Sequence, residues 1–238
     1  MLLDTDMSMI TDGELYKLMT WLSPNFPVGA FAYSHGLEYA VETGTVSDAE
    51  TLTQWVAGIL TFGAGRVDAA LFRAAHEAET RQDDDHLARI AELGEAQRAT
   101  REMALESAQQ GRAFLDTLLK VWPEPRLEAW QASLALTGRE PAYAVAVAVA
   151  SAAAGIALAP TLNAYLHGFA ANLVSAGVRL VPLGQTDGQR AMAKLEATVL
   201  AAVDNVLRRD PDDFGSAAVT VDWMSMQHET QYTRLFRS

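Results

Sequence analysis

Apolar and polar residues recur along most of this chain at the three-to-four-residue spacing of an amphipathic α-helix. The clearest case covers residues 99–122, and a second long one covers about 188–209. In the first, small and apolar residues follow a 4-3-4-3-4 spacing on one side: Ala104, Ala108, Gly111, Leu115, Leu118 and Trp122. Polar residues line the opposite side: Glu102, Glu106, Gln109, Asp116 and Lys120. The pattern predicts a long helix with one packed and one polar side.

Capping and helix-breaking residues mark where the helices begin and end. Thr11 with Glu14 and Ser47 with Glu50 have the spacing of capping boxes, which predicts helices from 11 to about 22 and from 47 to about 63. Shorter helices are predicted at 33–43, 68–80, 84–96, 126–136, 162–176 and 222–227, with an irregular hinge at 177–188. Residues 144–150 alternate with the period of two of a strand, but the length of the apolar stretch and the high helix propensity of Ala favour a helix there. With no confident strand elsewhere, we expect an all-α fold. It would be a single-domain bundle of roughly ten helices over residues 1–238, with a C-terminal partner-binding tail at 228–238.

Residues 141–159 are apolar throughout and long enough to cross a membrane. The stretch consists mostly of Ala, which is a weak hydrophobe with high helix propensity, and Ser151 and Gly155 interrupt it. Pro141 suits the first turn of a helix. We therefore predict a close-packed central helix rather than a membrane span. The first eleven residues lack the basic segment of a signal peptide, so we expect a cytoplasmic protein.

Composition and charge narrow the classes of function. The net charge of −12 argues against binding to nucleic acid, and the absence of cysteine excludes disulfides and thiolate chemistry. Acid is unevenly spread, because residues 1–60 hold eight carboxylates against Lys17, whereas the tail holds Arg234 and Arg237 against Glu229. Such asymmetry fits complementary contact surfaces, and it also fits a plain acidic protein.

A search for catalytic motifs finds little. The Gly-containing segments at 63–66 and 182–189 lack the lysine of a phosphate-binding loop, and the five histidines are scattered. Only Ser34, His35 and Glu38 form a tempting cluster. On a helix, His35 would lie about 100° from the face that Ser34 and Glu38 share. The three side chains would then be badly placed to pass a proton from one to the next. We therefore expect a protein that is not an enzyme.

Two segments suggest binding to another protein. Residues 23–44 place aromatic residues on a Pro- and Gly-shaped loop before an acidic helix. The tail combines aromatic, leucine and arginine residues, a composition typical of interface hot spots, although chain ends are usually polar and frayed. A tail that folds back onto its own domain would have the same composition, so both interpretations stay open.

Three motifs carry a family resemblance. They are SPNFPVGAFAYSHGLE at 23–38, SAGVRLVPLGQTDGQ at 175–189 and SMQHETQYTRLFRS at 225–238. In their order and position along a chain of this length they resemble the UreF family of urease accessory proteins. The departures are small: Ala32 replaces a more usual Ser, His35 a Gln, and Gln227 an Arg. His35 adds either a metal ligand or a pH-sensitive charge.

The resemblance implies an all-α, typically dimeric protein without catalysis of its own. Such a protein joins UreD (UreH in some species) and the GTPase UreG on apo-urease, as a chaperone complex for GTP-dependent nickel insertion. It implies that nickel and GTP are handled by the partners, and that no cofactor or metal is bound directly. The partner-binding residues that it suggests are Tyr33, Glu38, Arg179, Tyr232, Arg234, Leu235, Phe236 and Arg237. For Arg179, an internal salt bridge is the alternative.

Three other hypotheses stay open at this point. The protein could carry nickel itself through His35, His228 and acidic residues of its first third. It could be a small-molecule enzyme, which would require a deep pocket around Ser34. Finally, Arg179 or Arg234 could act as an arginine finger on the GTPase.

Overall fold

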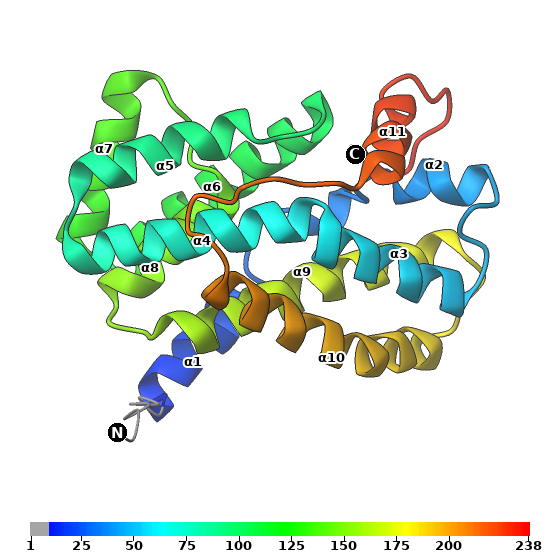
Figure 1. The fold of residues 1–238 in the computed structure, drawn as a ribbon, viewed down its shortest axis with the longest axis horizontal. Helices are drawn as coiled ribbons and strands as arrows, with labels where there is room; N and C mark the ends of the chain where they lie inside the picture. Colours follow the sequence, from blue (N-terminus) through cyan, green and yellow to red (C-terminus); the bar gives the residue numbers. More distant parts are fainter. Residues whose placement is uncertain (1–9) are drawn as a thin grey trace.

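The computed structural model describes residues 10–238, and in this range the chain is helical with no strand. The elements are α1 (Asp12–Trp21), the 3₁₀ turn η1 (Ala30–Ala32), α2 (Leu37–Glu42), α3 (Ala49–Phe62), α4 (Ala64–Arg81), α5 (Asp84–Ala96), α6 (Arg101–Val121), α7 (Pro125–Thr137), α8 (Tyr143–Ala153), α9 (Leu158–Leu180), α10 (Gln185–Arg208) and α11 (Val219–His228). Figure 1 shows α4 in the middle of the molecule. The predicted all-α fold is confirmed.

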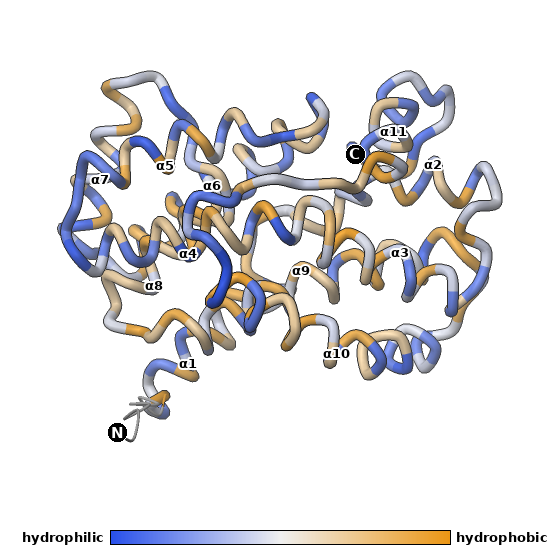
Figure 2. The backbone as a smooth tube through the Cα atoms, viewed as in Figure 1, coloured by the Kyte–Doolittle hydropathy of each residue, from blue (hydrophilic) through white to orange (hydrophobic). Residues whose placement is uncertain are grey.

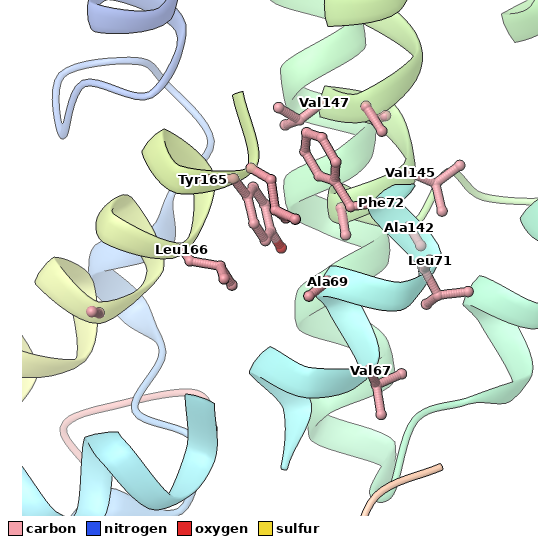
Figure 3. Close-up of a cluster of buried hydrophobic side chains, with 14 of the residues drawn as sticks. Val67, Ala69, Leu71, Phe72, Ala142, Val145, Val147, Tyr165 and Leu166 are labelled. Atoms are coloured by element: carbon pink, nitrogen blue, oxygen red, sulfur yellow. The ribbon is translucent and has the colours of Figure 1, made fainter. Parts of the chain in front are cut away.

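The core is built around α4 and α8, which pack on each other and on α9, and α8 also packs on α6. Every residue of α8 from Ala144 to Ser151 is buried, so this short apolar helix lies inside the protein. Figure 3 shows side chains of α4, α8 and α9 meeting there, among them Phe72 and Tyr165. Small side chains allow close approach: a Cβ on Gly111 of α6 would lie 1.9 Å from the carbonyl oxygen of Pro141. The predicted central, close-packed alanine-rich helix is therefore present.

The predicted length of that helix is wrong. Instead of covering 141–159, α8 ends at Ala153, and Gly155 adopts a left-handed φ of 75° before α9 begins. Pro141 precedes the helix rather than lying in its first turn. One other stretch, Ala49–Arg81, is long and apolar enough to cross a membrane by length and composition. It consists of two helices, α3 and α4, and 67% of its most apolar window is buried in the protein.

Further predicted boundaries also change. The hinge expected at 177–188 shrinks to 181–184, because α9 continues to Leu180 and α10 already begins at Gln185. Gly177 serves packing rather than bending, since a Cβ there would lie 2.4 Å from a methyl group of Leu52. The helix expected at 33–43 begins only at Leu37.

The two predicted capping boxes had different outcomes. The box of Thr11 and Glu14 is confirmed, with Thr11 N donating to Glu14 Oε2 at 2.7 Å. The second is wrong in its residues: Asp48 caps α3, and its carboxylate accepts from Thr51 N at 2.8 Å. An Asp is as good a cap as Ser, so the helix still begins where it was expected.

The polar side predicted for α6 is only partly in contact with solvent. Gln109, Asp116 and Lys120 are exposed, but Glu102 and Glu106 are buried. The C-terminal part of the chain covers these two glutamates. After α10 an extended segment leads back along the start of α4 to α11, which packs beside α2 (Figure 1), and Ala217 N donates to Phe62 O at 2.7 Å on the way. Figure 2 shows the polar start of this segment passing into more apolar α11.

Candidate functional site

The tail, residues 228–238, folds back onto its own chain. Its backbone pairs with the loop that precedes α2: Arg237 N donates to Ala32 O, and Ser34 N donates to Ser238 O, both at 2.7 Å. Phe236 is buried with 4% of its surface exposed. Of the two interpretations that the sequence left open, folding back is therefore present, and it leaves the neighbouring side chain of Leu235 exposed.

One carboxylate holds most of the tail. Glu38 of α2 accepts from Leu235 N through Oε1 at 2.6 Å and from Phe236 N through Oε2 at 2.9 Å. His228 Nε2 lies 3.1 Å from the same Oε2 atom. Glu38 is buried, so these bonds take the place of water around its charge.

His228 lies between two carboxylates in the interior. Its side chain has no exposed surface, and Nδ1 lies 2.7 Å from Glu102 Oε2 of α6. Both ring nitrogens of His228 therefore lie within hydrogen-bond distance of a carboxylate oxygen. Arg234 Nη1 donates to the other oxygen of Glu102 at 2.8 Å. We call Glu38, His228 and Glu102 the latch.

The loop that receives the tail is shaped by left-handed residues. Gly29, His35 and Gly36 have φ values of 76°, 53° and 71°. Only glycine fits at position 36. A Cβ there would lie 2.7 Å from Ser225 N of α11, and the left-handed φ would strain any other residue. These turns explain why the helix starts late and why Ser34 does not share a helix face with Glu38.

His35, like His228, lies against a buried carboxylate of α6, which in this case is Glu106. Its Nδ1 atom lies 3.1 Å from Glu106 Oε2 of α6, and its ring meets Phe169 edge-on at 5.1 Å. Burial opposes protonation of the ring, but the adjacent Glu106 carboxylate outweighs it, and the pKa of His35 is raised. Glu106 also accepts from Ser238 Oγ at 3.0 Å, which ties this pair to the tail.

The geometry does not favour an enzyme at Ser34, His35 and Glu38. The Ser34 hydroxyl donates to the Ser238 carbonyl oxygen, Glu38 accepts from the tail, and His35 faces Glu106. The cavity beside His35 is only about 40 Å³, enough for water but not for an organic substrate. Its walls include a buried Asp68–Arg98 pair with N···O 2.6 Å.

Metal ligands are not brought together in the part of the chain that the structure describes. Residues 10–238 contain no group of three or more His, Asp or Glu side chains arranged to hold a metal ion. His35 and His228 are separately engaged with carboxylates. His167, another of the five histidines, is exposed on α9.

The eight predicted partner-binding residues gather in one region, but not all face outward. Tyr33, Glu38 and Phe236 are buried, and their contacts are internal, including a 2.5 Å bond from the Tyr33 hydroxyl to Gln109 Oε1. The exposed members are Arg179, Tyr232, Arg234, Leu235 and Arg237. The structure thus divides the predicted set into residues that shape the tail and residues that it presents.

Arg179 has no carboxylate partner among residues 10–238, so the internal salt bridge considered from the sequence is not found. Its guanidinium carbon lies 4.4 Å from the centre of the Phe236 ring, a cation–π geometry. Nη2 donates to Phe31 O at 2.8 Å. Arg179 therefore covers the tail from the side of α9.

Sequence reasoning missed several residues of this site. Glu102 and Glu106 were assigned to the polar side of α6, and His228 was considered only as a metal ligand. An open groove of about 650 Å³ between α6 and the tail was also missed. Its walls include Arg101, Leu105, Leu235 and Arg237. No periodic signal reveals such a groove, because its two walls are more than a hundred residues apart in sequence.

Comparison with known proteins shows the family to which the chain belongs. The family model described as UreF matches residues 46–196. A urease accessory protein UreF of Rhodopseudomonas palustris (strain BisB18) is 50% identical over 236 residues, covering 99% of this chain and 96% of the relative. The UreF proteins of Bradyrhizobium diazoefficiens and Granulibacter bethesdensis are 46% and 48% identical, covering 98% and 95% of this chain and 95% of each relative. This chain belongs to the UreF family of urease accessory proteins.

Proposed function

We propose that this chain is a non-catalytic chaperone of urease maturation. It binds UreD (UreH in some species) through the exposed residues of its tail, and it recruits or regulates the GTPase UreG on apo-urease for GTP-dependent nickel insertion. It acts in the cytoplasm as a homodimer. Nickel and GTP are held by the partners rather than by this chain.

The observation that carries the proposal is the way the tail is presented. Tyr232 and Leu235 are large residues that are 103% and 66% exposed, on a tail whose backbone amides at Leu235 and Phe236 donate to the buried Glu38 carboxylate. Exposed aromatic and aliphatic side chains on a rigid support have the composition and preorganisation of an interface hot spot. Membership of an accessory-protein family supports a role that needs partners.

A co-purification experiment with UreD and UreG tests the proposal. Removing residues 228–238 is a poor variant, because it deletes the buried His228 and Phe236 and exposes two carboxylates that they cover. The double variant Tyr232→Ala and Leu235→Ala changes only exposed side chains. We expect it to keep the wild-type circular dichroism spectrum and to lose UreD. Its matched control, Leu136→Ala, changes a leucine of α7 that is 89% exposed, and it should bind normally.

Retention of UreD by the double variant at wild-type levels would remove the tail from the interface. Equilibrium dialysis of the isolated chain against micromolar nickel tests the claim about the metal. Retained nickel that is lost in His35→Gln or His228→Gln would instead favour the nickel-carrier hypothesis. Sedimentation of the isolated chain tests the homodimer.

A further inference from the structure

Three arginines around the tail, unlike Arg234 and most other arginines, lack a carboxylate partner in the part of the chain that the structure describes. Within residues 10–238, ten arginines form an ion pair with Asp or Glu within 4.0 Å. Arg101, Arg179 and Arg237 form none within residues 10–238, although the chain has twelve more acidic than basic residues. On an acidic protein, uncompensated cations gathered in one place suggest a surface that receives negative charge.

These cations flank an apolar strip. Arg101 and Arg237 line the groove between α6 and the tail, together with the exposed leucines Leu105 and Leu235. The groove also contains the carboxylate of Glu229, which accepts from the backbone amide of Arg101 at 3.1 Å. Arg179 lies next to the groove through its contact with the ring of Phe236, which forms part of the wall. The groove is open and holds about 650 Å³, enough for several side chains of a peptide segment.

We propose that this groove binds an acidic segment of the partner protein. The segment's carboxylates pair with Arg101 and Arg237, and an apolar side chain of the segment packs between Leu105 and Leu235. The inference rests on the proposed function, in which the tail contacts UreD, and it specifies the chemistry that the partner must offer. Phosphate would satisfy the arginines but would leave the two leucines without a role, so the mixed lining favours a peptide.

The latch makes the groove possible. Glu38 and Glu102 fix the tail on α2 and α6, and the tail supplies one whole wall of the groove. Glu102 is already paired with Arg234 and His228, so its charge does not neutralise Arg101 or Arg237. The latch thus fixes the wall that carries Arg237 before a partner arrives, which reduces the entropy lost on binding.

Charge reversal tests the proposal on the full chain. Binding of immobilised UreD is measured for the wild type and for the double variant Arg101→Glu and Arg237→Glu. We expect at least about a tenfold loss of affinity and a weaker dependence on salt, because two charge pairs are removed. The matched control is Arg89→Glu, an exposed arginine of α5 that also lacks a carboxylate partner among the described residues. Equal affinities of the double variant and this control would overturn the proposal.

Inorganic phosphate distinguishes the two kinds of anion. Added at constant ionic strength against chloride, it should leave the affinity for UreD unchanged. Competition by phosphate that disappears in the double variant would make the groove a phosphate site and overturn the peptide assignment.

Photocrosslinking identifies the segment. With Leu105→p-benzoylphenylalanine in the complex, we expect crosslinks to a UreD peptide rich in Asp and Glu, and none from the same replacement at Leu136. Crosslinks to a neutral or basic peptide, or none at all in an intact complex, would overturn the groove while leaving the proposed function standing. If the wild-type chain does not bind UreD, the proposed function itself fails.

Discussion

At the scale of single residues, Glu38 joins three parts of the chain. Its two oxygens accept from two tail amides and face His228, all in the interior. We expect Glu38→Gln to lower the free energy of unfolding by about 2–3 kcal/mol, because it removes a buried charge partner and turns an amide donor toward other donors. Urea denaturation measures the change. Glu42→Gln, one turn later on α2, keeps an oxygen that can accept the exposed hydrogen bond from Gln231 of the tail, so it should cost less than about 0.5 kcal/mol. Equal effects would mean that the tail adds no stability through Glu38.

His35 predicts a pH dependence of stability. Although burial opposes it, the Glu106 carboxylate and the more distant Asp68 raise the pKa of this ring above that of the unfolded chain, and Arg98 only partly offsets them. The folded state therefore holds the proton more tightly. Its contribution is complete below the unfolded pKa of about 6.5 and is lost as pH rises through the folded pKa. Through this group, the urea midpoint should fall as the pH rises from about 6 to about 9.

The variant His35→Gln isolates this contribution. It should flatten the fall in the urea midpoint over the same range, whereas His86→Gln, on the partly exposed surface of α5, should leave the fall unchanged. The buried His76 has a lowered pKa from desolvation and acts in the opposite direction, so the comparison must be between variants at each pH. A slope that is the same in both variants would rule out His35 as its source.

At the scale of elements, the contact of α6 with the segment entering α8 depends on one glycine. A Cβ at Gly111 would lie 1.9 Å from the carbonyl oxygen of Pro141, which is backbone and cannot rotate away. We expect Gly111→Ala to cost about 3 kcal/mol or more, as overpacking against backbone does. Gly58→Ala in α3 is the control, because a Cβ there meets nothing within 4 Å. It should be neutral or stabilise by up to about 1 kcal/mol. Thermal unfolding compares the two, and a harmless Gly111→Ala would show that α6 can move.

The tail allows stability and binding to be separated. Phe236 is 4% exposed and lies under Arg179, so Phe236→Ala should cost about 3 kcal/mol of stability. Its neighbour Leu235 is 66% exposed, and Leu235→Ala should leave stability within about 0.5 kcal/mol while weakening capture of UreD. Denaturation and co-purification of both variants should show that Phe236→Ala loses stability, whereas Leu235→Ala loses UreD and keeps its stability. If both variants lost stability equally, the tail would not have one buried and one presented side.

Local patterns predicted the helices well but not what covers them. The periodicity around Leu115 identified α6, because a small or apolar residue recurs on the same side of the helix at each turn. It could not show that Glu102 is buried, because the groups that pair with it, His228 and Arg234, are 126 and 132 residues away. The late start of α2 depends similarly on Gly36 meeting α11. Motif reasoning found the right region but not the division between inward and outward residues.

At the scale of the whole molecule, stability should be graded from the centre to the edge. Helix α8 is buried along its length and packs on α4, α6 and α9, whereas only Leu18 and Trp21 are buried in α1. Amides of α8 should therefore exchange with deuterium only by global unfolding, and those of α1 by local opening at much lower free energy. The tail should lie between them, because its amides bond to buried Glu38 but its side chains are half exposed. Hydrogen exchange read by mass spectrometry orders the three segments. Glu38→Gln should raise the exchange rate of the tail amides to that of α1 without changing the rate of α8. A tail that already exchanges as fast as α1 in the wild type would show that the latch is open in the isolated chain.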